Sequence, residues 1–87
     1  MLVKRVPGAT WRWFRGDVLV LSSDGGRARV GGAGALVWTV LDEPVEVGEI
    51  GPKVEARWPT VGPATPVLVN DAIEVLESSG LVTIEET

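Results

Sequence analysis

Apolar and polar residues alternate with a period of two over the first third of the chain and follow a helical period after it. Residues 11–14 and 17–21 alternate on either side of Arg15-Gly16, which is a two-residue hairpin signal. Residues 22–26 consist of serine, aspartate and glycine and predict a second turn. Residues 27–30 then alternate again. The pattern predicts three antiparallel strands before Gly31-Gly32.

The two turns set the predicted register of these strands. They pair residue 14 with 17 and residue 21 with 28, and alternate side chains then point to opposite faces. The expected core face carries Phe14, Leu19, Leu21, Ala28 and Val30, with Arg12 at its rim. The expected outer face carries Trp11, Trp13, Val18, Val20, Arg27 and Arg29. On that face the two tryptophans would lie beside arginines and make cation–π contacts. A slip of one residue would exchange the faces.

Apolar spacings of three and four residues predict three helices in the rest of the chain. The first is an amphipathic helix over residues 33–42, and the second lies within residues 47–58. Pro52 requires that the second helix starts near Gly51 or that its first turn is irregular. The third helix covers residues 67–79, with Val69, Ile73 and Leu76 facing inward and Gly80 as its stop.

These elements place the protein in the α+β class. We expect a three-stranded antiparallel sheet followed by a three-helix winged-helix-like bundle, in one domain that spans residues 1–87. Residues 81–84 are apolar and indicate a short terminal strand. Trp38 and Trp58 are expected in or near the core, because an indole buries a large apolar area.

The composition narrows the function. The chain has no cysteine, histidine or tyrosine, which removes thiolate nucleophiles, the usual metal ligand and the usual general base near neutral pH. We therefore expect a binding module that is not an enzyme and that uses no metal or cofactor. No apolar run approaches the roughly 20 residues that span a bilayer, and no apolar segment follows the basic start, so we expect a cytoplasmic protein.

Charge is unevenly distributed along the chain. Residues 1–29 have six basic and two acidic side chains, a net charge of +4, whereas residues 30–87 have a net charge of −8. The predicted third helix is acidic and lacks lysine and arginine, so duplex DNA would repel it. The same acidity suits a peptide that carries basic residues. The glycine-rich segment 30–36 has some likeness to a dinucleotide fingerprint, but Val37 occupies the third glycine position and no doubly wound pattern surrounds it.

Three stretches together resemble one protein family. They are Gly34-Ala35-Leu36-Val37-Trp38-Thr39-Val40-Leu41-Asp42, then Val47, Glu49, Ile50 and Trp58, and then Asp71, Ile73, Leu76, Gly80, Leu81 and Val82. In this order they are similar to the PqqD-like family, the peptide chaperones or precursor-peptide recognition elements of ribosomally made and modified peptides. The resemblance spans residues 17–82. The chain departs from the family pattern at Gly31-Gly32-Ala33, at Glu43-Pro44 and at Pro52.

The resemblance implies that the chain binds the leader of a precursor peptide as an additional strand along residues 27–30, in a groove against the third helix. The strand side of this site would be Arg27, Ala28, Arg29, Val30 and Gly31, and the helix side Asp71, Glu74, Val75 and Ser78. The two acids would pair with cations of the leader, and Val75 would supply an apolar contact. Replacing Ala28 with proline is then expected to abolish binding without unfolding the protein.

The resemblance also implies a second partner, a separate enzyme that modifies the core peptide while this chain holds the leader. A radical SAM enzyme, a leader peptidase or a cyclase would fit that role. No nucleic acid or membrane is expected as a partner. Because an exposed strand edge can pair with another copy, a monomer and a strand-swapped dimer are both compatible with the sequence.

One alternative function stays open. The chain can be a protein–protein interaction or regulatory module without a peptide client, which docks through a face formed by Trp11 and Trp13. The pattern does not decide whether these two tryptophans form such a face or cover the sheet.

Overall fold

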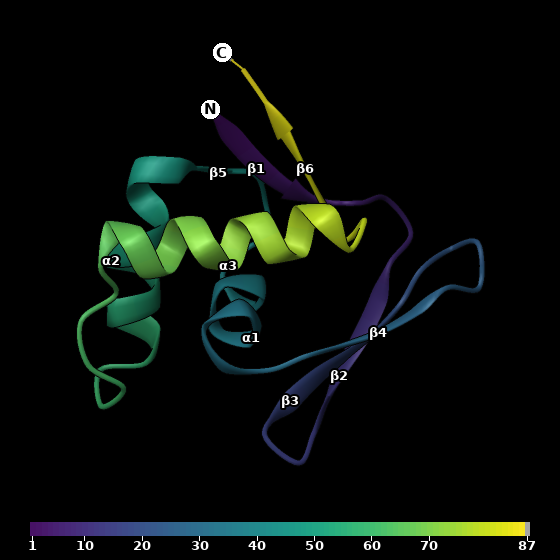
Figure 1. Cartoon of the computed structure of the whole chain (residues 1–87), viewed down its shortest axis with the longest axis horizontal. Coiled ribbons are helices and arrows are strands. Elements are labelled where there is room, and N and C mark those ends of the chain that lie inside the picture. Colours follow the sequence, from purple (N-terminus) through teal and green to yellow (C-terminus); the bar gives the residue numbers. More distant parts are fainter. Residues whose placement is uncertain (87) are drawn as a thin grey trace.

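Three helices and two three-stranded antiparallel sheets form the fold, seen in a computed structural model that describes residues 1–86 (Figure 1). The strands are β1 (Leu2–Arg5), β2 (Thr10–Phe14), β3 (Asp17–Leu21), β4 (Arg27–Val30), β5 (Val45–Glu46) and β6 (Val82–Glu85). The helices are α1 (Gly32–Thr39), α2 (Val47–Arg57) and α3 (Pro66–Ser78). The predicted α+β class, with its antiparallel sheet followed by three helices, is confirmed.

Two tight turns build the sheet β2-β3-β4. Arg15 and Gly16 have positive φ angles of 53° and 84°, as a type I′ turn requires. At the second turn, Gly25 N–H donates to Ser22 O and Ser22 N–H donates to Gly26 O, while Gly25 has a φ of 90°. This geometry is a type I turn followed by a glycine bulge. It pairs Leu21 with residue 27 and not, as predicted, with residue 28.

The predicted core face of this sheet is correct for Ala28 and Val30 but wrong for Phe14, Leu19 and Leu21. The register aligns Trp11, Val20 and Ala28 in one row and Trp13, Val18 and Val30 in another, and these two rows form the inner face. Val18 and Val20 are 0% and 2% exposed, whereas Phe14 and Leu21 are 38% and 46% exposed on the outer face. The reason is that β3 is the central strand and packs against α1, so its two valines fill the core.

The second sheet, β5-β1-β6, joins distant parts of the chain. Val3 of β1 pairs with Val45 on one side and with Ile84 on the other, and it is completely buried. The terminal strand predicted at residues 81–84 corresponds to β6. The pattern predicts neither β1 nor β5, because strands of four and two residues are too short to show a periodicity.

Helix α1 lies at the centre of the core. It packs against α2, α3 and β3, and its buried residues are Gly34, Ala35, Val37, Trp38 and Thr39. Because neighbours surround it, α1 is not the amphipathic helix that the spacing predicts. It also ends at Thr39 rather than at residue 42, and the next two residues stay buried in a turn.

Helices α2 and α3 have the predicted positions. Helix α2 lies within the predicted residues 47–58, but it starts at Val47 and holds Pro52 in its interior, so the expected start near Gly51 is wrong. In α3, Thr65 Oγ1 accepts a hydrogen bond from Leu68 N–H at 3.3 Å, and Gly80 has a φ of 73° after the last turn. Among residues 1–86, none of the helices combines the length and apolar character needed to cross a bilayer.

One charged side chain, Arg5, joins the two sheets. Its guanidinium lies 4.6 Å from the ring centroid of Trp38 in α1 and 5.3 Å from that of Trp11 in β2. Its Nη2 also donates a 2.6 Å hydrogen bond to the carbonyl of Trp38. Burial lowers the pKa of Arg5 and the carboxylate of Asp42 opposes that shift, but a guanidinium stays cationic at neutral pH.

Replacing Arg5 with alanine is expected to lower the free energy of unfolding by about 2–4 kcal/mol, because two cation–π contacts and a charge-assisted hydrogen bond are lost. Urea denaturation followed by tryptophan fluorescence measures this change. Lys4→Ala is the control, because Lys4 lies on the same strand and forms a surface ion pair with Glu85, worth less than about 1 kcal/mol. Equal losses for the two variants would contradict the role of Arg5.

Two glycines of α2 provide a matched pair of substitutions. A Cβ at Gly48 would meet open space, so Gly48→Ala should raise the free energy of unfolding by about 0.5–1 kcal/mol through helix propensity. A Cβ at Gly51 would lie 2.9 Å from the carbonyl oxygen of Ala64, so Gly51→Ala should lower it by about 1–3 kcal/mol. Urea denaturation of both variants tests this, and a stabilised Gly51→Ala protein would contradict it.

Candidate functional site

The open edge of β4 is the first half of the predicted site. β4 pairs with β3 on one side, and no other strand within residues 1–86 pairs with its second side. Antiparallel pairs alternate between hydrogen-bonded and non-hydrogen-bonded, and the bond from Ser22 N–H to Gly26 O sets the phase of this alternation. Ala28 and Val30 therefore direct their backbone groups to β3, whereas Arg27 and Arg29 direct theirs to the open edge.

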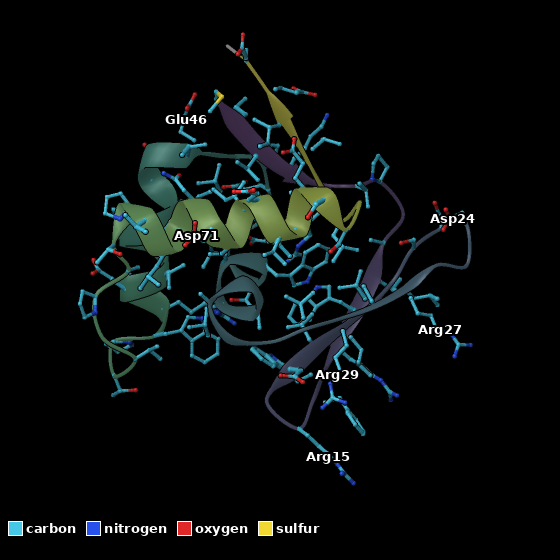
Figure 2. The ribbon with its side chains drawn as sticks, in the orientation of Figure 1. Arg15, Asp24, Arg27, Arg29, Glu46 and Asp71 are labelled. Atoms are coloured by element: carbon cyan, nitrogen blue, oxygen red, sulfur yellow. The ribbon has the colours of Figure 1, made fainter. Side chains whose placement is uncertain are left out.

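The side chains of β4 divide between two faces. Ala28 is partly buried and Val30 is buried on the inner face. Arg27 and Arg29 are exposed on the outer face, and Figure 2 shows both side chains pointing away from α3. The strand thus presents small or buried apolar side chains on one face and cations on the other.

Asp17 lies against the end of β4, close to Arg29 and Gly31. Its carboxylate forms an ion pair with Arg29 Nε. A Cβ at Gly31 would lie 2.7 Å from Asp17 Oδ1, so a glycine permits this close approach at the start of α1. Gly31 therefore has a steric role at the junction of strand and helix.

An exposed stripe along α3 contains the predicted helix side of the site. It consists of Val67, Leu68, Asp71, Glu74, Val75 and Ser78. The apolar members are unusually accessible, with Val67 69%, Leu68 48% and Val75 54% exposed. The hydroxyl of Ser78 lies 2.9 Å from the carbonyl oxygen of Glu74, so it is already engaged with its own helix. Val67 and Leu68 are not among the predicted site residues, although their spacing from Asp71 and Val75 follows the helical period.

The residues predicted on α3 differ in how close they lie to the sheet that contains β4. Figure 2 shows Asp71 well separated from Arg27 and Arg29. The C-terminal end of α3 is the end nearer to the sheet β2-β3-β4 (Figure 1). Val75 and Ser78 belong to the last turn of α3, so along the helix they lie nearer to this sheet than Asp71 does.

The tryptophans of β2 lie elsewhere than predicted. Trp11 and Trp13 are on the inner face, opposite to Arg27 and Arg29, and Trp11 contacts Arg5 instead. Their ring centroids are 6.2 Å apart.

A second contact ties these rings to α2. Trp13 packs edge-on against Trp58, with ring centroids 5.7 Å apart, and Trp58 Nε1 donates a 3.2 Å hydrogen bond to Thr39 Oγ1. Trp38 is fully buried and Trp58 packs against the core, as predicted. The β2 side of the sheet is therefore tied to the helices, and β4 is the opposite edge.

The surface has two hollows near these elements. One has a volume of about 760 Å³ and lies over the sheet, where Arg12, Leu19, Leu21, Arg27 and Arg29 border it. The other has a volume of about 360 Å³ and lies between the start of α1, the loop at residues 61–64 and the start of α3. Neither of the two is bordered by both β4 and α3, so neither corresponds to the predicted groove.

The chemical groups at the predicted site are backbone donors and acceptors, guanidinium groups, carboxylates and exposed apolar side chains. Within residues 1–86, no three side chains of histidine, cysteine, aspartate or glutamate gather in a group that could hold a metal ion. These groups are suited to hold an extended peptide.

Comparison with known proteins supports the fold. No family model matches the sequence, and no curated protein matches it. A solved structure described as TbiB1 in complex with the TbiA(beta) leader peptide is similar, with a TM-score of 0.67 and 17% sequence identity. The similarity covers 97% of this chain and 99% of that chain, so the two share their overall fold.

Hydrogen exchange should separate the two sets of β4 amides. The amides of Arg27 and Arg29 face the open edge and should exchange at least about tenfold faster than those of Ala28 and Val30, which are bonded within the sheet. Exchange measured by NMR tests this assignment. Equal protection of all four amides would mean that another chain, such as a second copy in a dimer, covers the edge.

Proposed function

We propose that this protein is a non-catalytic adaptor that binds the leader of a ribosomally made precursor peptide. The leader adds as a strand to the open edge of β4, on the side of the sheet that faces the C-terminal end of α3. The observation that carries the proposal is the free backbone edge of β4, where Arg27 and Arg29 direct their N–H and C=O groups outward.

Backbone pairing would provide much of the affinity. Two outward residues offer two donors and two acceptors, and each hydrogen bond has a net value of about 0.5–1.5 kcal/mol. Such bonds do not depend on the sequence of the peptide, so selectivity must come from the side chains on either side of the edge. Strand addition at an exposed edge is an established mode of peptide recognition.

Helix α3 would supply the second surface. Val75 is 54% exposed in its last turn and gives a leader side chain an apolar contact. Glu74 lies beside it and can pair with a lysine or arginine of the leader. Asp71 is further from the sheet and would meet a leader that continues along the helix.

The similar solved structure supports the proposal, because that protein is described in complex with a leader peptide. In this proposal a separate peptide-modifying enzyme acts on the core peptide while the adaptor holds the leader. A radical SAM enzyme, a leader peptidase and a cyclase are the candidates. The proposal places no chemistry on this chain.

The rival function, docking of another protein through Trp11 and Trp13, has less support. Trp11 is covered by Arg5, and Trp13 packs against Trp58. Both rings therefore have partners inside the fold.

The edge can be tested by replacing Arg29 with proline, which removes an outward N–H and leaves the β3–β4 bonds intact. Affinity for a synthetic candidate leader peptide, measured by calorimetry, should fall about tenfold or more relative to Arg29→Ala, which keeps the N–H. Ala28→Pro is not a suitable test, because the N–H of Ala28 bonds to β3 and its loss would damage the sheet itself. The sequence-based prediction therefore names the wrong residue, because the N–H of Ala28 does not face the open edge.

An NMR titration with the same leader locates the contact. Shifts at residues 27–31 and in α3 are expected. Equal affinity of the Arg29→Pro and Arg29→Ala proteins would exclude strand addition at β4. Shifts centred on Trp11 and Trp13 would favour the rival docking face.

A further inference from the structure

The outer face of the sheet arranges its side chains in rows that end at the open edge. One row runs from Arg12 through Leu19 to Arg29, and the next runs from Thr10 through Leu21 to Arg27. A strand added to β4 would extend each row by one residue. Those two added residues would lie directly opposite Arg29 and Arg27, on the same face of the sheet.

At the open edge, each of these two rows ends in an exposed arginine. Arg29 uses its Nε for the ion pair with Asp17, so the two outer nitrogens of its guanidinium point beyond that pair. Its position is fixed further by Phe14, whose ring centroid lies 5.7 Å from the guanidinium carbon. A carboxylate on an added strand would meet a preorganised donor at Arg29 and a second cation at Arg27.

The residue of the added strand that lies between these two positions would face the inner side of the sheet. Trp11, Val20 and Ala28 form a row there, and an added residue opposite Ala28 would continue it on the side of the core. Ala28 has a small side chain and is partly buried, so a larger apolar side chain beside it can cover the end of the core.

We infer that the peptide recognised at β4 contains an acidic–apolar–acidic tripeptide, with its carboxylates opposite Arg29 and Arg27 and its apolar side chain opposite Ala28. This specificity rests on the proposed function, because the side chains meet only if a peptide pairs with β4. It differs from a general attraction for anions, since the acids must fall on alternate residues. The two arginines make this edge positively charged, although the whole chain has a net charge of −4.

A selection of random peptides of about twelve residues, long enough to span β4, tests this specificity. Phage-displayed peptides are selected on the wild-type protein and on the Arg27→Glu/Arg29→Glu double variant. The wild type should enrich acidic residues two positions apart around an apolar residue, and the double variant should enrich basic residues at the same positions. In synthetic copies of the selected peptides, exchanging both acids for lysine should lower affinity for the wild type about tenfold.

Two further variants keep the test decisive. Arg27→Glu alone avoids placing a glutamate beside Asp17 and should reverse the preference at one position, which matters if the double variant folds poorly. Arg12→Glu makes the same charge change on the same face but on β2, and it should leave the preference unchanged. If Arg12→Glu reverses the preference instead, the peptide pairs with β2 and the inference is wrong.

The outcomes separate the inference from the proposed function. Selected peptides that bind Arg29→Ala but not Arg29→Pro, yet show no alternation of charge, would overturn the inference and leave strand addition in place. Selected peptides that bind both of these variants equally would overturn strand addition itself, and the inference with it. A charge preference that weakens at high salt is expected, because the pairs are exposed.

Discussion

The fold depends on a cation held between two tryptophans where the two sheets meet. The Arg5 guanidinium, at the end of β1, contacts Trp11 of β2 and Trp38 of α1. Within residues 1–86, Arg5 Nε and Trp38 Nε1 are buried without a hydrogen-bond partner. An unpaired buried polar group costs roughly 1–3 kcal/mol. Packing of both rings on the guanidinium, with its bond to the Trp38 carbonyl, must offset that cost.

This junction also determines which strand edge stays open. The connection between β1 and β2 covers only residues 6–9, so the contact between Arg5 and Trp11 fixes where the sheet β2-β3-β4 begins. The contact between Trp13 and Trp58 then ties β2 to the end of α2. β4 lies on the other side of β3, away from these contacts. The interactions that stabilise the fold therefore leave the β4 backbone available.

Sequence signals were sufficient where the residues that decide a structure are close together in the chain. Arg15-Gly16 predicts its hairpin, and Gly80 predicts the end of α3. The second turn was harder, because it contains two adjacent glycines and the one that forms the bulge decides the register and the faces of β4. The predicted site residues lie on the predicted elements, but the direction of each backbone group depends on that turn. Arg5 had no local signal, since Trp38 is 33 residues away.

When a peptide binds as an added strand, backbone groups provide much of its affinity and side chains provide its specificity. Proteins with this fold can therefore differ widely in sequence and still bind peptides in the same way under the proposed function. The two chains share a fold at 17% identity, so this fold needs few side chains in common. Backbone groups at a strand edge are the same whatever the sequence, so under the proposed function they give affinity without selecting a peptide. The rows that end at Arg27 and Arg29 are side-chain features, and they can change without changing the edge. Under the proposed function, chains of this fold would choose different peptides by altering the last residue of each row.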